Sequence, residues 1–135
     1  MSFRPATLDD AYVLYRWRKA DELEAVYQGV RTTPGKHIVW LSQRLDNPLV
    51  RILIWEHNGE PAGMVRIDSG GELAFHAQNT TTAVKMLRAA HRFADQYGGR
   101  LKVVLDQDDQ RNEILVRAGY REYPARFHCF KVDKS

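Results

Sequence analysis

A glutamate and a histidine lie four residues apart in a short apolar segment, and both side chains can take up or release a proton. The composition of residues 72–77 predicts a β-strand. In a strand, side chains two residues apart point to the same face, so Glu72, Ala74 and His76 share one face. The alternative is that His76 is a half-exposed strand residue satisfied by a neighbour, because a lone histidine is weak evidence for a site.

A polar loop follows this strand and leads into the longest predicted helix, over residues 80–97. The loop consists of Gln78, Asn79, Thr80, Thr81 and Thr82. The free N–H groups and the dipole at a helix N-terminus attract anions, and Asn79 or a threonine hydroxyl could cap the helix while leaving amides free. The loop is therefore a candidate anion site, and a plain polar loop with a helix cap is the other interpretation.

The remaining cysteine and aspartate signals favour structural roles. Cys129 has no partner for an internal disulfide and belongs to no zinc-ligand pattern, which favours a small packed side chain. The aspartates at 106, 108 and 109 lack the spaced ligands and glycine of a calcium loop, so a solvated turn is favoured over a metal site.

Tryptophans and arginines of the predicted N-terminal helices offer a further candidate surface. Trp17, Trp40 and Trp55 could line an acceptor pocket, but each falls on an apolar periodicity, which favours the core. Four arginines could bind an acidic acceptor or partner, although solvated helix faces are the commoner explanation: Arg16, Arg18, Arg31 and Arg44.

The elements that must position these residues follow from capping and periodicity. Thr7 and Asp10 form a capping-box pattern that starts a helix continuing through Lys19. Further helices are predicted over 21–30, 37–45, 80–97 and 111–118, with residues 33–35 as a break. Strands are predicted over 3–6, 50–55, 62–68, 72–77, 101–105, 120–123 and 127–132, with Asn58-Gly59 as a hairpin turn. The resulting order is β-α-α-β-β-β-α-β-α-β-β.

Length and charge limit the class of protein. The 135 residues, 44% hydrophobic and 27% charged, suit one globular domain over residues 1–135. A net charge of +3 is a weak field for binding nucleic acid. The start of the chain has no signal-type region, and no apolar run approaches the ~20 residues that span a bilayer, so we expect no membrane insertion and a cytoplasmic setting.

The ordered set of motifs resembles the GCN5-related N-acetyltransferase family. Residues 3–11 are similar to its opening strand and helix, residues 56–65 to its hairpin, and residues 112–121, with Arg117-Ala118-Gly119-Tyr120-Arg121, to its last helix and the turn after it. The resemblance implies an α/β fold with a twisted, mostly antiparallel mixed sheet, flanking helices and an opening between the fourth and fifth strands. It also implies acetyl-CoA as cosubstrate and a small-molecule or protein amine as acceptor.

The same resemblance implies roles for the candidate residues. The backbone of Phe75 to Ala77 would bind pantetheine, residues 78–82 the pyrophosphate, and His76 or Glu72 would act as base. Asp109 and Asn112, at the start of the last helix, would also contact the cofactor. This chain departs from the family where its loop lacks glycines and where Val116 occupies a tyrosine position, which leaves water, Tyr120, Tyr123 or no group at all to protonate the leaving thiolate.

These departures support an alternative of another class. A non-catalytic protein could keep this fold as an interaction module, for example as a phage virion or host-binding component, because a fold survives the loss of its site. An enzyme should present an open cleft between the fourth and fifth strands, whereas such a module would bury a broad face against another chain. A homo-oligomer or a protein partner stays open in either case.

Overall fold

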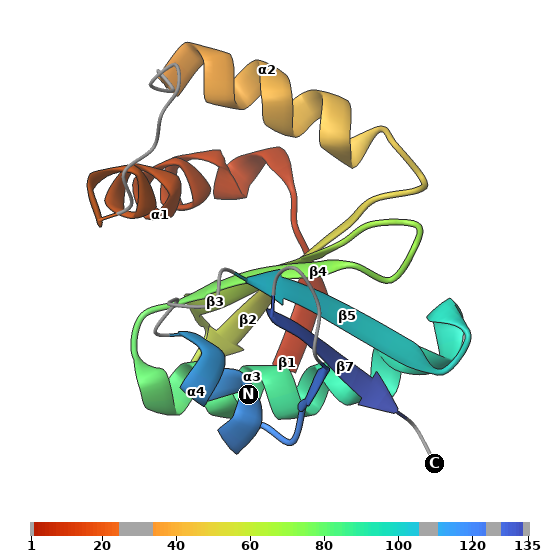
Figure 1. Cartoon of the computed structure of the whole chain (residues 1–135). Helices are drawn as coiled ribbons and strands as arrows, with labels where there is room; N and C mark the ends of the chain where they lie inside the picture. Colours follow the sequence, from red (N-terminus) through yellow and green to blue (C-terminus); the bar gives the residue numbers. More distant parts are fainter. Residues whose placement is uncertain (1, 25–33, 106–110, 124–127, 134–135) are drawn as a thin grey trace.

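The chain folds into two β-sheets flanked by helices (Figure 1). The computed structural model describes residues 2–24, 34–105, 111–123 and 128–133. The strands are β1 (Ser2–Pro5), β2 (Arg51–His57), β3 (Glu60–Ile67), β4 (Leu73–Ala77), β5 (Arg100–Leu105), β6 (Arg121–Tyr123) and β7 (His128–Asp133). The helices are α1 (Ala11–Glu24), α2 (Pro34–Leu45), α3 (Thr80–Ala90) and α4 (Arg111–Arg117), with 3₁₀ segments at Leu8–Asp10 and His91–Tyr97. The order of strands and α-helices is the predicted one.

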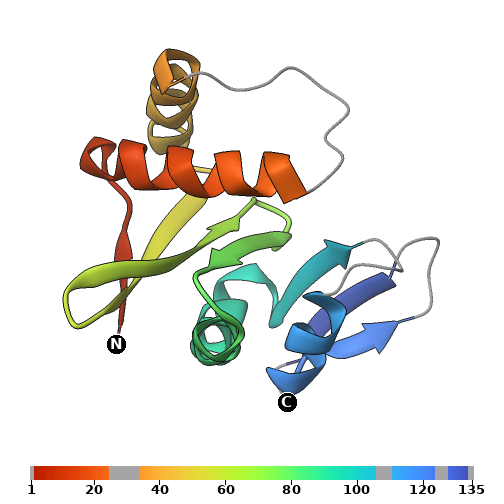
Figure 2. The same ribbon diagram turned by 90° about the vertical axis from the view of Figure 1, so that its left-hand side faces the viewer.

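The two sheets meet at one point and then separate. The first sheet has the antiparallel order β1-β2-β3-β4, and the second has the order β5-β7-β6. A single parallel bridge between Glu72 and Lys102 joins them, and the Lys102 N–H donates to the Gly71 carbonyl at 2.8 Å. Beyond this bridge the described residues of β4 and β5 do not pair, and the two sheets lie apart in Figure 2. The predicted opening between the fourth and fifth strands is confirmed.

Strand β2 supports hydrophobic clusters on both of its faces, as its apolar sequence predicts. Ile52 and Ile54 pack with Leu14 and Leu41 under α1 and α2. Leu53 and Trp55 lie on the other face, in the larger cluster that also contains the buried side of α3. Figure 1 shows α1 and α2 on one side of the sheet and α3 and α4 on the other. Burial on both faces fixes the sheet between two helical layers.

The two short turn motifs have the geometry that their residues predict. Asn58 and Gly59 have φ values of 53° and 79°, which is the left-handed pair of a two-residue hairpin turn between β2 and β3. At the start of the first helix, the Asp10 carboxylate accepts a hydrogen bond from the Thr7 N–H at 2.8 Å. The capping box is therefore present, with a 3₁₀ turn before the α-helix.

Helix boundaries differ from the predicted ones in three places. Helix α1 runs without a break to Glu24, although the pattern predicts a second helical piece from 21; residues 25–30 of that piece lie outside the described residues. Helix α2 begins at Pro34 because proline is well suited to the first turn, where its missing N–H has no acceptor. The long predicted helix changes to a 3₁₀ segment after Ala90.

One predicted core residue of α2 is not buried. Ile38, predicted on the apolar stripe of this helix, is 50% exposed.

Candidate active site

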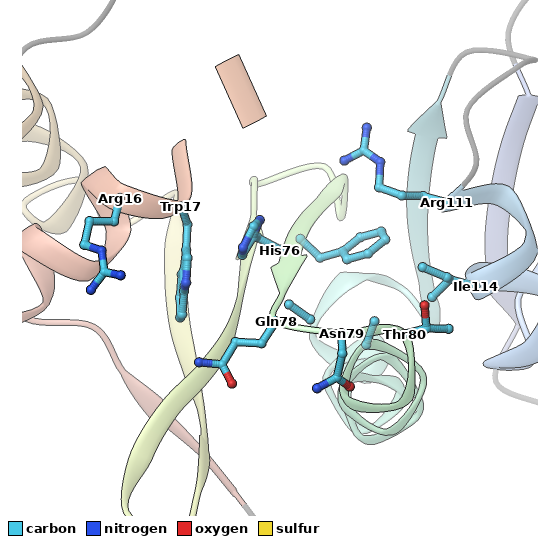
Figure 3. Close-up of a pocket in the computed structure, with 11 residues that line it drawn as sticks. Arg16, Trp17, His76, Gln78, Asn79, Thr80, Arg111 and Ile114 are labelled. Carbon is cyan, nitrogen blue, oxygen red and sulfur yellow. The ribbon is translucent and has the colours of Figure 1, made fainter. Parts of the chain in front are cut away.

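A cleft of about 580 Å³ opens where β4 and β5 separate. Its floor is the end of β4 and the first turn of α3, and its walls come from α1 and α4 on opposite sides (Figure 3). The lining residues are Arg16, Trp17, Phe75, His76, Ala77, Gln78, Asn79, Thr80, Ala83, Arg111 and Ile114. The cleft therefore gathers residues from four elements that are far apart in sequence.

Alternate residues of β4 direct their backbone N–H and C=O groups toward this cleft. The Gln78 N–H donates to the Ala62 carbonyl at 3.0 Å, and the Glu72 carbonyl accepts from Asp68, so the even-numbered residues of this segment bond to β3. In an antiparallel pair the intervening residues point their backbone groups the other way. The N–H and C=O groups of Phe75 and Ala77 therefore face the side from which β5 has diverged. This edge is free to add an extended ligand in the manner of a further strand.

Helix α3 places its N-terminus on the floor of the cleft. The Asn79 side chain caps the helix by accepting from the Thr82 N–H at 2.8 Å, one of the two capping options that the sequence leaves open. The first N–H that donates within the helix is that of Ala83, to the Asn79 carbonyl at 3.0 Å. The amides of Thr80 and Thr81 come before it and have no intrahelical acceptor, so helix geometry leaves them directed outward. Two amides and the positive end of the helix dipole are the elements of an anion site.

The side chain of His76, near the end of β4, reaches α1, where its ring stacks on Trp17. The ring centroids are 5.1 Å apart and the planes are inclined by 27°. Trp17 also packs on the cluster under α1 and α2, so the core role predicted for it is incomplete: it forms part of the cleft wall. Trp55 is buried in the core as predicted.

The cleft carries positive charge. Among the described residues that line it, Arg16 and Arg111 are charged and none is a carboxylate. The Arg16 guanidinium lies 5.7 Å from the centre of the Tyr12 ring, and that of Arg111 lies 5.7 Å from the centre of the Phe75 ring. Anionic groups are therefore the ligands that these walls favour.

Some predicted site residues do not reach the cleft. Glu72 is exposed at the opposite end of the segment, about 13 Å from His76 at ~3.3 Å per residue. Thr81 and Thr82 lie on α3 between the lining residues Thr80 and Ala83 and are not among the lining residues themselves. Asn112 is half-buried on α4 beside Arg111, and Asp109 lies outside the described residues. The structure thus brings together His76, Gln78, Asn79, Thr80 and the backbone of Phe75 and Ala77.

The tyrosine candidates for proton donation are reduced to one. Val116 is 54% exposed and has no proton to give. The Tyr120 hydroxyl is buried and donates to the Leu87 carbonyl at 3.1 Å, and burial raises the pKa of this phenol. The Tyr120 hydroxyl therefore links α3 to the segment after α4 and is not placed to donate a proton in the cleft. The side chain of Tyr123 lies outside the described ones.

Besides Ala83 of α3, the lining residues Arg111 and Ile114 have no functional prediction from the sequence. Both lie on α4, one helical turn apart, and both face β4 across the cleft (Figure 3). The i, i+3 spacing could have indicated a shared face, but periodicity does not say which face meets a ligand. Arg18, Arg31 and Cys129 have no described side chain.

Two further features are absent from the described ranges of the chain, a metal-ligand cluster and a membrane-spanning helix. No group of three His, Cys, Asp or Glu side chains in those ranges could hold a metal ion. No helix there is long and apolar enough to cross a membrane.

Comparison with solved structures identifies the fold. The acetyltransferase AAC(6')-Ib in complex with ribostamycin and coenzyme A matches with a TM-score of 0.76 at 17% identity, covering 98% of this chain and 93% of that one. An N-acetyltransferase from Staphylococcus aureus Mu50 matches with 0.76 at 14% identity, covering 98% and 97%. RimL, the ribosomal L7/L12 alpha-N-protein acetyltransferase, in complex with coenzyme A, matches with 0.76 at 10% identity, covering 97% and 93%.

The chain therefore has the GCN5-related N-acetyltransferase fold, as its motifs predict. No family model matches the sequence, and no curated protein matches it. At these low identities the likeness extends over nearly the whole chain in structure and is weak in sequence.

Proposed function

We propose that this protein is an acetyl-CoA-dependent N-acetyltransferase that acetylates an amine of a small molecule or a protein. The observation that carries the proposal is the cleft at the separation of β4 and β5, with the N-terminus of α3 on its floor. Solved structures with this fold contain coenzyme A, which supports the same ligand here. The residues present fit that ligand, since the cleft combines an open strand edge with an anion site.

The proposed cofactor site uses backbone more than side chains. Pantetheine contains amides, and the backbone groups of Phe75 and Ala77 can bond to them along the open edge of β4. The pyrophosphate would lie against the amides of Thr80 and Thr81, within the loop 78–82. Because the Asn79 side chain already accepts from the Thr82 N–H, the amides of Thr80 and Thr81 are the ones proposed for the anion. Arg111 adds a positive charge on the α4 wall.

The proposed chemistry assigns the proton to His76. Acetyl-CoA supplies the acetyl group as an activated thioester. An amine attacks only when it has lost its ammonium proton, and the His76 ring, held by Trp17 in the cleft, is placed to accept it. The new C–N bond replaces the C–S bond. The attacking nitrogen gives its second proton to water, and the departing thiolate takes up a proton from water; a thiol with a pKa of about 8.5 is mostly protonated at pH 7, so no tyrosine is required.

An activity measurement on paired variants tests this proposal. The protein and acetyl-CoA are incubated with a panel of primary amines, and amine-dependent thiol release is measured with mass detection of the acetylated product. We expect His76→Ala to lower this rate by about 100-fold, the usual contribution of a general base. His57→Ala, an exposed histidine at the end of β2, is the matched control and should leave the rate unchanged. Equal rates in wild type and His76→Ala would remove His76 from the mechanism.

A further inference from the structure

We infer that the acceptor amine carries an anionic group, a carboxylate or a phosphate, that Arg16 binds. This inference rests on the proposed function and adds to it the substrate class. The observation behind it is the set of charges in the cleft: two arginines and no carboxylate among the described residues that line it.

Arg16 is available to bind a ligand. Its guanidinium lies over the ring of Tyr12 on its own helix, and among the described residues no carboxylate forms an ion pair with it. The side chain is exposed and lines the cleft beside Trp17. A guanidinium presents paired N–H donors in the geometry that matches a carboxylate or phosphate.

The position of Arg16 places it on the acceptor side. The anion site proposed for the cofactor is at the first turn of α3, and Arg111 lies on the α4 wall, whereas Arg16 and Trp17 lie on the opposite wall (Figure 3). His76, the proposed base, stacks on Trp17 on that same side. The Trp17 ring lies between Arg16 and His76 in Figure 3, so an acceptor whose amine reaches His76 would extend past Trp17 to place its anionic group at Arg16.

Charge then selects among amines. The Arg16 guanidinium repels an ammonium group, and it repels a polyamine most. A carboxylate or phosphate on the acceptor reverses this balance by pairing with Arg16. The anion would also hold the amine in a fixed orientation next to the imidazole.

Binding of matched amines to the protein saturated with coenzyme A tests the inference without requiring turnover. The probes are phenylalanine against phenylalaninamide, phosphoethanolamine against ethanolamine, and spermidine, each titrated by calorimetry. The first pair isolates a carboxylate and the second a phosphate. The variant is Arg16→Gln. The control is Arg44→Gln, because Arg44 also lies 5.7 Å from an aromatic ring four residues earlier, that of Trp40, and does not line the cleft.

We expect wild type and Arg44→Gln to bind at least one probe that carries an anionic group about tenfold more tightly than its counterpart without that group, and Arg16→Gln to lose that preference. Equal affinity within both pairs, or no binding of any probe, would overturn the inference. A weaker affinity of Arg16→Gln for coenzyme A itself would also overturn it, since Arg16 would then bind the cofactor and not the acceptor. Failure of wild type to bind acetyl-CoA is a separate result that removes the proposed function, and the inference with it.

Discussion

Trp17 of α1 and His76 of β4 stack in the cleft with ring centroids 5.1 Å apart and planes inclined by 27°. The contact connects the N-terminal helical layer to the strand that forms the cleft floor. It orients the imidazole of His76 from one side and leaves the ring among the lining residues of the cleft. The position of the proposed base thus depends on a residue that is nearly sixty positions earlier in the chain.

Substitution of Trp17 should impair turnover more than cofactor binding. Trp17→Ala removes the stacked partner, and since aromatic pairs contribute about 0.5–1.5 kcal/mol, we expect a loss of amine-dependent rate of up to about tenfold. Trp17→Phe keeps an aromatic face and should retain most of the rate. Acetyl-CoA affinity should stay unchanged in both variants. The measurement is steady-state thiol release beside calorimetry, and a rate for Trp17→Ala equal to that of wild type would show that the stack does not position His76.

Asp10 should stabilise the fold through Arg4. Its carboxylate is 5% exposed and accepts two hydrogen bonds from the Arg4 guanidinium, at 2.8 and 2.9 Å. We expect Asp10→Asn to lower the free energy of unfolding by about 2 kcal/mol at pH 7, the scale of a hydrogen bond to a charged group. Asp9→Asn, an exposed aspartate in the same turn, is the control and should change it little. Urea unfolding measures both, and equal values for the two variants would contradict this role.

The pH dependence of the Asp10 contribution follows from the same contact. The Arg4 guanidinium lowers the pKa of Asp10 below its ordinary value of 3.8. A group whose pKa is lower in the folded state stabilises the fold above the unfolded value, and this stability is lost as the pH falls through the folded value. The difference in unfolding free energy between wild type and Asp10→Asn should therefore be full above pH 5 and should shrink below pH 3.8. A constant difference over that range would contradict the assignment.

His91 should make the protein less stable in mild acid. Burial lowers the pKa of His91 below its ordinary value of 6.5, with a further lowering from the charge of Arg88. The unfolded chain therefore takes up this proton first, and the free energy of unfolding should fall as the pH drops below 6.5 towards the folded pKa. The decline should be smaller in His91→Gln and unchanged in His57→Gln, an exposed control. Chemical unfolding at pH 7.5 and 5.5 gives the comparison, and parallel losses in wild type and His91→Gln would contradict it.

Gly63 of β3 should be required for the cleft floor. A Cβ built at this residue would lie 2.8 Å from the Met86 sulfur and 2.9 Å from the His76 carbonyl oxygen. Gly63→Ala should therefore cost about 1–3 kcal/mol of unfolding free energy and weaken acetyl-CoA binding by displacing the end of β4. Gly70→Ala, where nothing lies within 4 Å, is the control. Thermal unfolding and calorimetry test the pair, and wild-type behaviour of Gly63→Ala would show that the floor tolerates the extra atom.

The fold could be predicted from local signals because those signals agree with the tertiary structure. The Asn58-Gly59 turn, the capping box at Thr7 and the two-faced apolar pattern of β2 each specify one geometry, and each is present. Helix ends were less predictable, as at Pro34, because a proline both ends and begins helices.

The sequence could predict only those site residues that are consecutive in the chain. His76 and the loop after it could be recognised, since strand, loop and helix are consecutive there. Trp17 could be named as a possible pocket residue, but its periodicity favours the core, and Arg111 had no predicted role, because their place in the cleft depends on how α1 and α4 pack against β4. Tyr120 is the converse case: its sequence position suits a proton donor, and its hydroxyl instead lies in the core, bonded to Leu87.

The central claim is that the first turn of α3 binds the pyrophosphate of acetyl-CoA, and calorimetric titration of acetyl-CoA into wild type, Thr81→Glu and Thr81→Gln tests it most directly. Thr81 is exposed next to the cleft, and a carboxylate in the first helical turn is compatible with the helix dipole, so Thr81→Glu should fold. We predict micromolar binding to wild type, similar binding to Thr81→Gln and a loss of about tenfold or more in Thr81→Glu. No binding to wild type at millimolar acetyl-CoA would contradict the account and leave an acetyltransferase fold without its cosubstrate.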